Sequence, residues 1–361
     1  MVPTEASAVS RRELAGPPSV FGLGRAGLVE LMRAAGEPEY RADQLLTWVY
    51  PRHVRDPRQM SNLPAALRAR LPELCDLELP AVESLLGNAS SDTHKFVLRL
   101  RDGERVECVS MRTDRRLTMC LSSQVGCALK CSFCATGLMG LRRNLDAGEI
   151  VAQVMVMGEY HQWRDDRFNL VFMGMGEPLV NYEPVVASIR VLREPGGLNL
   201  GARRITVSTS GVVPQMRRLA DEGLALGLAL SLHATTDATR NELVPINRQW
   251  PIAEVLETAR EYGRKTGRRV ALEYTLIAGV NDSPEDAERL SAFARSLPSK
   301  INLIPYNPVP GLKWQRPSPE SVTAFAESLY PRAPAVTVRN TMGGEIWAAC
   351  GQLGGLSPGA G

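Results

Sequence analysis

No stretch of this sequence is apolar for long enough to cross a membrane. A spanning helix needs about 18 or more apolar residues in a row, and no run approaches that length. Residues 1–20 carry Arg11 and Arg12 but lack the apolar centre of a signal peptide. We therefore predict a cytoplasmic protein without membrane contacts, in which residues 1–24 form a disordered tail.

Charge of one sign is scarce as well. The formal net charge is only +3, and the hydrophobic and charged fractions, 44% and 22%, are those of ordinary globular proteins. These values exclude a fibrous or largely disordered chain, and they identify no partner. Residues 25–70 are locally basic, which we interpret as a solvated surface first and as an RNA contact second.

Histidine is rare, and the cysteines do not suit a disulfide framework. Seven cysteines are an odd number in a chain that shows no export signal, and only four histidines accompany them. Four of the cysteines lie between Cys120 and Cys134, while Cys350 stands alone near the end. This clustering favours free, reactive or metal-bound thiols.

The first part of the chain has a helical pattern. Apolar residues at helical spacing recur over residues 25–70, so we expect residues 25–94 to form a small helical accessory domain that contacts RNA. Residues 95–100 and 105–111 alternate on either side of Asp102 and Gly103, which is a strong hairpin signal. We expect residues 95–112 to be a hairpin that links this domain to the rest.

The second part, residues 113–354, alternates short β-rich runs with helical patterns. Asp146 and Glu149 form a capping box at the start of the first clear helix. The predicted strands are 117–122, 169–173, 205–208, 226–232, 271–277 and 301–305. Six β–α repeats imply a parallel sheet, curved or closed as a barrel, with an extension carrying Cys350 and a tail at 355–361.

The sharpest motif is a cysteine triad that directly follows the first predicted strand of the barrel. Cys127, Cys131 and Cys134 have the spacing C-x3-C-x2-C, and three thiolates in so short a loop can wrap an iron–sulfur cubane. A structural zinc site needs four ligands, and no further cysteine pair or nearby histidine supplies the fourth. Three ligands leave one iron open for a substrate to chelate.

Polar residues follow the other predicted strands. They are Gly176 and Glu177, Ser208, Ser231 and His233, and Asn307. Each taken alone is an ordinary loop residue, and His233 alone is an ordinary hydrogen-bonded scaffold residue. Together they gather at the carboxyl ends of parallel strands, where barrel enzymes bind their ligands.

Two cysteines outside the triad are ambiguous. Cys120 lies in the first predicted strand of the barrel, and Cys350 is flanked by small residues. Spacing alone favours a buried structural role for each, because reactivity requires thiolate character and access.

Five segments closely resemble the RlmN/Cfr family of radical S-adenosylmethionine enzymes, which methylate an adenine carbon in RNA. They are SSQVGC at 122–127, GMGEPL at 174–179, STSGVV at 208–213, VPIN at 244–247 and AACGQL at 348–353. The resemblance implies an α/β fold, a partial (βα)6 TIM-like barrel preceded by a small helical domain. It also implies a [4Fe–4S] cluster held by the cysteine triad.

The resemblance assigns roles to further residues. The positions that match contacts to S-adenosylmethionine are Gly176, Glu177, Ser208, Ser231, Leu232, His233 and Asn307. Two S-adenosylmethionine molecules are used per turnover. One methylates Cys350, and the other yields a 5′-deoxyadenosyl radical that takes hydrogen from the new S-methyl group. The methylene radical adds to adenine, and Cys120 removes the ring proton and resolves the adduct through a transient disulfide with Cys350. Glu107 occupies the place of a family proton acceptor.

The family contains two regiochemistries. One branch methylates carbon 2 of an adenosine in 23S rRNA and in tRNA next to the anticodon, and the other methylates carbon 8 of the rRNA adenosine and confers antibiotic resistance. Pro178 and residues 307–311 resemble the first branch, whereas Arg112 and Met342 depart from it. We predict carbon 2, with carbon 8 as the alternative.

The expected partners follow from this function. They are 23S rRNA, tRNA and an electron donor such as flavodoxin, and the chain is expected to be a monomer. Arg142 and Arg143, just past the triad, face either RNA phosphates or solvent. Two other functions compete: a radical enzyme of the same fold without methyl transfer, and a non-catalytic electron carrier or RNA-binding protein.

Overall fold

The computed structural model describes residues 16–354 except 89, 114–115, 164–167 and 340. The predicted tail at 355–361 and most of the predicted tail at 1–24 lie outside these residues. In the part of the chain described, no helix is long and apolar enough to span a membrane.

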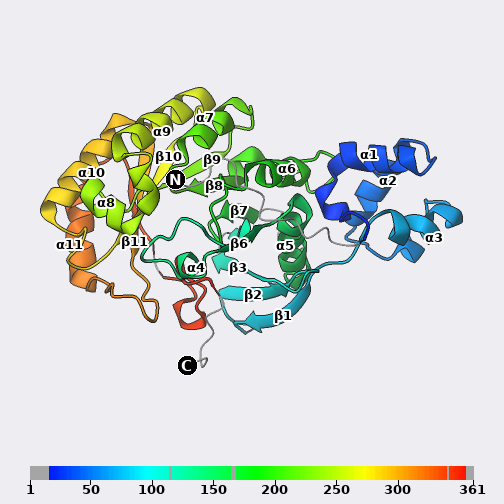
Figure 1. The fold of residues 1–361 in the computed structure, drawn as a ribbon, viewed down its shortest axis with the longest axis horizontal. Helices are drawn as coiled ribbons and strands as arrows, with labels where there is room; N and C mark the ends of the chain where they lie inside the picture. Colours follow the sequence, from blue (N-terminus) through cyan, green and yellow to red (C-terminus); the bar gives the residue numbers. More distant parts are fainter. Residues whose placement is uncertain (1–15, 89, 114–115, 164–167, 340, 355–361) are drawn as a thin grey trace.

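One curved mixed sheet forms the centre of the molecule (Figure 1). Within the described residues it has ten strands in the order β1-β2-β3-β4-β7-β8-β9-β10-β11-β12. All neighbours from β4 to β12 are parallel, and those from β1 to β4 are antiparallel. The strands are β1 (Ala81–Leu86), β2 (Thr93–Arg99), β3 (Arg105–Thr113), β4 (Arg116–Cys120), β7 (Phe168–Phe172), β8 (Ile205–Thr209), β9 (Gly227–Ser231), β10 (Val270–Leu276), β11 (Ser299–Pro305) and β12 (Val336–Val338).

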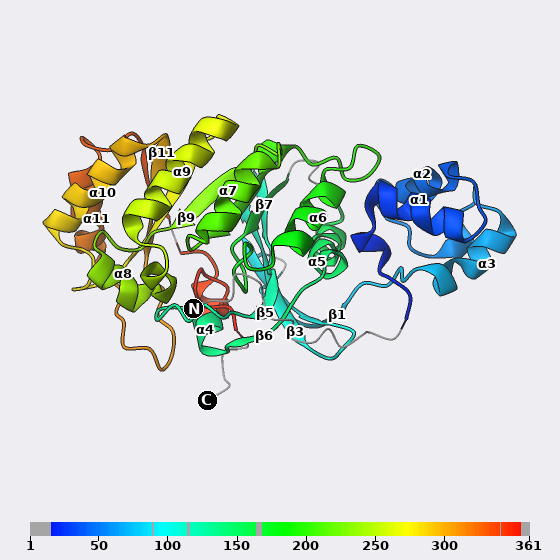
Figure 2. The same ribbon diagram turned by 45° about the horizontal axis from the view of Figure 1, so that its top comes forward.

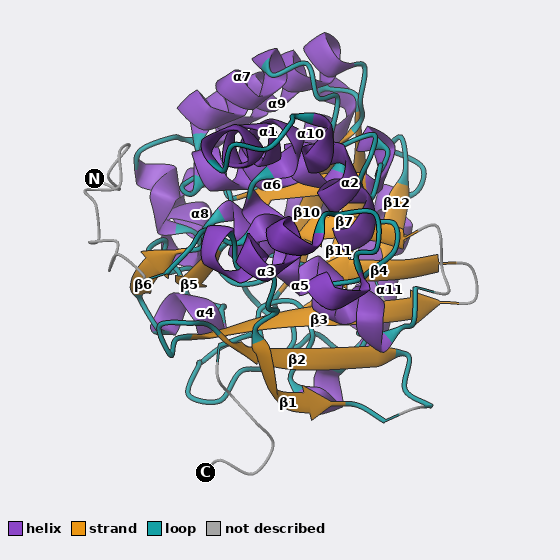
Figure 3. Cartoon of the chain, turned by 90° about the vertical axis from the view of Figure 1, so that its right-hand side faces the viewer, coloured by secondary structure: helices purple, strands orange, loops and turns teal. Residues whose placement is uncertain are grey.

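The α/β prediction is confirmed, and β4 and β7–β11 are the six predicted strands. The predicted hairpin also forms, as β2 and β3 around a turn in which Gly103 has φ +87°. Its role differs from the expected linker, because β3 pairs with β4 and the hairpin extends the barrel sheet (Figure 3). The predicted helical domain, residues 25–94, includes β1, which is a strand paired with β2 and belongs to the sheet. The largely exposed edge position of β1 leaves no apolar alternation in the sequence to detect.

The N-terminal helices form a lobe beside the barrel (Figures 1 and 2). They are α1 (Gly24–Ala34), α2 (Tyr40–Val49) and α3 (Ala65–Leu74), with 3-10 turns η1 (Val20–Gly22) and η2 (Pro57–Gln59). The expected disorder up to residue 24 is wrong for η1, because Val20 and Phe21 are fully buried. A Cβ at Gly22 would lie 2.9 Å from the Gly148 backbone nitrogen, so this turn packs directly on the barrel.

Most of the remaining helices cover the outside of the sheet, and the short helix that follows the cysteine triad lies beside the C-terminal segment instead (Figures 1 and 2). They are α4 (Ala135–Leu138), α5 (Ala147–Tyr160), α6 (Tyr182–Leu192), α7 (Val213–Asp221), α8 (Asp237–Leu243), α9 (Ile252–Thr266), α10 (Pro284–Ser296) and α11 (Pro319–Leu329). The predicted capping box of α5 is present, since Asp146 accepts from the Glu149 amide and Glu149 accepts in return. Helices α10 and α11 each begin with a capping serine followed by proline, at Ser283 and Ser318.

The strand register places several polar side chains on one face of the sheet. Ser231 of β9 lies beside Glu273 of β10, and Glu273 lies beside Asn302 of β11. Residues paired across neighbouring strands point to the same face. Following the register through β8 and β7 places Ser208 and Cys120 on that face as well.

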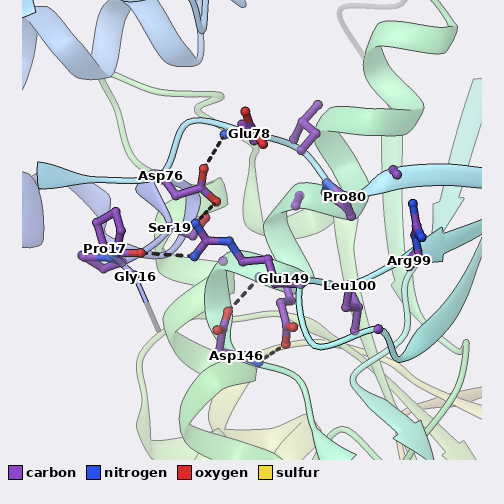
Figure 4. Close-up of a pocket in the computed structure, with 17 residues that line it drawn as sticks. Gly16, Pro17, Ser19, Asp76, Glu78, Pro80, Arg99, Leu100, Asp146 and Glu149 are labelled. Atoms are coloured by element: carbon purple, nitrogen blue, oxygen red, sulfur yellow. Dashed lines mark hydrogen bonds and ion pairs between the residues drawn. The ribbon is translucent and has the colours of Figure 1, made fainter. Parts of the chain in front are cut away.

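A pocket separates the N-terminal lobe from the barrel (Figure 4). It is lined by residues from 16–19, 76–81, 99–103 and 146–152. Arg101 spans it, with a guanidinium nitrogen 2.7 Å from Asp76 and another donating to the Pro17 carbonyl at 3.2 Å. Arg143 pairs with Asp102 at 2.6 Å and with Glu149, which lines this pocket, at 2.8 Å. The Arg143 guanidinium is thus engaged within the protein, whereas Arg142 is exposed and pairs with Glu104.

We expect Arg143→Ala to lower the free energy of unfolding by about 3 kcal/mol, because two largely buried carboxylates lose their common partner. The Arg143 side chain is 18% exposed and that of Arg142 is 61% exposed. The matched variant Arg142→Ala should cost at most about 1 kcal/mol, as exposed ion pairs do. Urea unfolding of both variants measures the difference, and equal losses would contradict the assignment.

Candidate active site

The cysteine triad lies in a loop that is fastened at both ends. The loop follows β5 (Gln124–Gly126), which pairs with β6 (Leu141–Asn144) in a second, two-stranded antiparallel sheet. The Cys127 amide donates to the Gly140 carbonyl at 3.0 Å, and the Cys134 amide donates to the Cys131 carbonyl at 3.2 Å. These bonds fix the loop where it leads from β5 to α4, and all three thiols line one pocket.

The environment of the triad suits metal ligation by thiolates. Burial raises the pKa of the Cys127 thiol to about 12 and that of Cys131 well above its ordinary value, and each thiolate repels the others. The raised pKa values mean that deprotonating these buried thiols is unfavourable without a metal. A coordinating cation removes this cost, because it stabilises the deprotonated thiol. Across the described residues, no three His, Cys, Asp or Glu side chains could share a single metal ion. A cubane differs, since each thiolate binds its own iron.

Glu177 follows β7 and is held rigidly within the pocket. One carboxylate oxygen accepts from the Leu179 amide at 3.2 Å and the other from the Ser210 amide at 2.8 Å. Burial raises the Glu177 pKa, and these hydrogen bonds oppose the shift. Gly176 has φ +99°, and a Cβ there would lie 2.6 Å from the Gln124 Cβ. The turn therefore requires glycine and leaves room for a ligand close to the backbone.

The ends of β8 and β9 contribute Ser208, Ser231 and His233. The hydroxyls of Ser208 and Ser231 lie 3.3 Å apart. Arg240, from α8, is fully buried behind them and donates to the carbonyls of Ser231 and Leu232 at 3.1 Å and 3.0 Å. The Leu232 side chain is buried and does not line the pocket. Its backbone carbonyl is held in place by the hydrogen bond from Arg240.

His233 is buried as a neutral imidazole. Its Nδ1 accepts a hydrogen bond from the Thr275 amide at 3.0 Å, and its ring meets Phe133 edge to face with centroids 4.9 Å apart. Burial, assisted by the nearby Arg240 charge, lowers the His233 pKa from 6.5 to about 3. The side chain therefore carries no charge at neutral pH.

We expect His233 to make folding sensitive to acid. Between pH 6.5 and about 3 the unfolded chain binds a proton at this imidazole that the folded chain does not bind. Its stabilising contribution is thus complete above pH 6.5 and declines as the pH falls toward 3. Asparagine tolerates the left-handed φ of +57° at this position. The variant His233→Asn should therefore reduce the slope of unfolding free energy against pH by up to ~1.4 kcal/mol per pH unit. Urea unfolding at pH 7, 6 and 5 measures the slope, and identical slopes would exclude this role.

Cys350 lies at the pocket in a loop tied to several elements. Its carbonyl accepts from the Asn307 side chain at 3.1 Å, and the Gly351 carbonyl accepts from the Ala135 amide at 2.8 Å. The C-terminal segment consequently lies beside α4, as Figure 1 shows. Of the seven cysteines, all described and all free, Cys350 alone is exposed. The thiol itself is desolvated by burial, which raises its pKa, and the Arg339 charge opposes the shift.

Cys120 and Glu107 lie on the same face of the sheet and do not line the pocket. Cys120 is buried, and burial together with the charge of a nearby Cys350 thiolate raises its thiol pKa to about 12. One Glu107 oxygen lies 3.5 Å from the buried Lys95 ammonium and accepts from the Gly354 amide at 3.2 Å. Glu107 therefore contacts the end of the Cys350 loop.

The structure thus brings most of the sequence-predicted residues to one pocket. Those that line it are Cys127, Cys131, Cys134, Gly176, Glu177, Ser208, Ser231, His233 and Cys350. Leu232, Asn307, Cys120 and Glu107 are buried and do not line it.

Comparison with known proteins identifies the family. Residues 121–290 match the Radical SAM superfamily, and residues 19–77 match the ribosomal RNA large subunit methyltransferase N-terminal domain. A probable dual-specificity RNA methyltransferase RlmN of Symbiobacterium thermophilum is 49% identical over 92% of this chain and 90% of its own. The chain belongs to the RlmN family of radical S-adenosylmethionine methyltransferases. Membership implies S-adenosylmethionine and an iron–sulfur cluster as cofactors.

A second relative and a solved structure agree with this family. The dual-specificity RNA methyltransferase RlmN of Anaeromyxobacter dehalogenans is 45% identical over 93% of this chain and 91% of its own. The crystal structure of a radical SAM methyltransferase from Sphaerobacter thermophilus superposes with a TM-score of 0.89 and 46% identity, covering 93% of this chain and 99% of that one.

The sequence interpretation missed three residues of the site. Gln124 accepts from the Glu177 amide at 2.9 Å, Arg240 fastens the ends of β8 and β9, and Glu273 lines the pocket. A signal existed for Glu273, which is the one charged residue in a strand whose seven residues are all buried. No local pattern marks Arg240, because the burial of a helical arginine depends on distant strands.

Proposed function

We propose that this protein methylates carbon 2 of an adenosine in 23S rRNA and in tRNA next to the anticodon, through an S-methylated Cys350. Its relatives carry the name dual-specificity RNA methyltransferase. The observation that carries the proposal is the position of Cys350 at the pocket of the cysteine triad, although more than 200 residues separate them in sequence.

Cys127, Cys131 and Cys134 would hold one [4Fe–4S] cluster. The cluster would supply the electron that cleaves a carbon–sulfur bond of one S-adenosylmethionine molecule. A second S-adenosylmethionine molecule in the same turnover would supply the methyl group. Glu177, Ser208, Ser231 and His233 form the pocket wall against which the cosubstrate would lie. Glu177 and His233 are buried, and a pocket wall that excludes water protects a reactive radical from side reactions.

The other side chains have roles that follow from their positions. Cys350 is exposed at the pocket, so its sulfur can accept and carry a carbon unit. Cys120 is buried near Cys350, and it is proposed to take the ring proton and to release the product by forming a disulfide with Cys350. Glu107, proposed as a proton acceptor, contacts the backbone of the same loop through Gly354. The Asn307 side chain donates a hydrogen bond to the Cys350 carbonyl. Asn307, which is proposed to contact the cosubstrate, therefore also holds the Cys350 loop.

The target base must leave its stack to reach the pocket, as for other enzymes that modify bases. We propose that the N-terminal lobe contacts the RNA. We also propose that an electron donor such as flavodoxin reduces the enzyme and that the enzyme is a monomer.

Mass spectrometry of ribosomal and transfer RNA, from cells with and without this gene, tests the function. We expect 2-methyladenosine in both RNAs only when the gene is present. Gene-dependent 8-methyladenosine would assign the alternative regiochemistry, and the absence of both products would overturn the proposal.

A further inference from the structure

Glu273 of β10 carries a buried carboxylate oxygen whose hydrogen-bonding capacity is unused. The residue is 3% exposed and lines the pocket beside Cys350. Its Oε1 accepts from the Asn302 side chain at 2.7 Å and lies 3.4 Å from an Arg339 guanidinium nitrogen. Its Oε2 accepts no hydrogen bond from any residue that the structure describes.

This arrangement differs from that of the other pocket carboxylate. Both oxygens of Glu177 accept backbone amides. A buried acceptor without a donor destabilises a fold by the cost of its lost hydration, so such atoms are rare unless a ligand completes them. The hydroxyl of Tyr306, on the neighbouring strand end, is also buried without a partner among the described residues and lines the same pocket. The wall formed by β10 and β11 therefore offers two polar groups to a ligand.

Asn302 and Arg339 fix the direction of the unused oxygen. They hold Oε1 from β11 and from the segment after β12, so the carboxylate cannot turn freely. The charges of Arg339 and Glu273 both act on the Cys350 thiol, which places the pair close to the sulfur that would carry the methyl group. Glu273 and Cys350 line the same pocket, so a base that reacts at Cys350 enters the space that Glu273 borders.

We infer that Glu273 recognises the target adenine by accepting a hydrogen bond from its exocyclic amino group. The inference rests on the proposed function. A carboxylate only accepts hydrogen bonds, and the exocyclic amine is the donor of an adenine ring whose nitrogens are acceptors. S-Adenosylmethionine offers donors of similar chemistry, so the test separates the two ligands.

The test combines one variant with one altered substrate. Holoenzyme of wild type and of Glu273→Ala is assayed on an RNA fragment with adenosine at the target position, and on the same RNA with purine riboside, which lacks the amine. For wild type we expect purine to lower kcat/KM by about 10- to 100-fold, the effect of one hydrogen bond to a charged group. Glu273→Ala should show a similar loss with adenosine and no additional loss with purine.

A second set of measurements separates the ligands. Equilibrium dialysis of S-adenosylmethionine against both holoenzymes should give equal Kd values, and the iron content should be unchanged. Weaker S-adenosylmethionine binding with equal losses on both RNAs would assign Glu273 to the cosubstrate and overturn the inference. If Glu273→Ala does not fold, the wild-type enzyme still tests the inference. Equal kcat/KM values for the adenosine RNA and the purine RNA would show that the amine is not recognised and would overturn the inference. Wild type inactive on adenosine RNA would instead refute the proposed function.

Discussion

Cys350→Ala is expected to abolish RNA methylation, with kcat falling by at least about 10³-fold, as when a covalent nucleophile is removed. The adenine ring carbon is a poor nucleophile, so a direct polar methyl transfer cannot replace the sulfur carrier. Cys350 is exposed and lines the pocket, whereas Cys120 is buried and does not line it, so Cys120 cannot take its place as the carrier. Mass spectrometry of RNA from single-turnover reactions measures the product.

Cys75→Ala is the matched control for this variant. Cys75 is buried where α3 ends in the N-terminal lobe and lines no part of the pocket, so its loss should leave methylation unchanged. A radical enzyme of the same fold without methyl transfer would keep full turnover when Cys350 is replaced. Full turnover of Cys350→Ala would therefore rule out methyl transfer through an S-methylated Cys350.

The barrel could be predicted from the sequence because its signals are local. A buried parallel strand such as β10 is a short, nearly continuous apolar run in the sequence. The start of α5 is marked by the capping box of Asp146 and Glu149. Strand β1 escaped prediction because an exposed edge needs no apolar face. The turn η1 escaped it because the burial of Phe21 depends on packing against α5, more than 100 residues away.

The site was predicted only where its residues are contiguous or carry a family motif. The triad and the Gly176–Glu177 turn are local, so their spacing was informative. Arg240 and Glu273 acquire their roles from partners on other elements, at Ser231 and Asn302. Glu273 interrupts an apolar strand, and a charge inside a buried strand is itself a reason to suspect a ligand or an ion pair.

Cys131→Ala is expected to remove the iron and, with it, all cleavage of S-adenosylmethionine. Cys131 is the central residue of the triad, and its backbone carbonyl also accepts from the Cys134 amide. Two thiolates cannot retain a cubane that needs three protein corners, so anaerobic reconstitution should yield close to no iron instead of about four per chain. The matched control Cys108→Ala removes a buried thiol from β3 that lies outside the pocket, and it should keep the full iron content and the visible absorbance. Iron retained in Cys131→Ala, or stoichiometric zinc in wild type, would show that these cysteines do not hold the cluster.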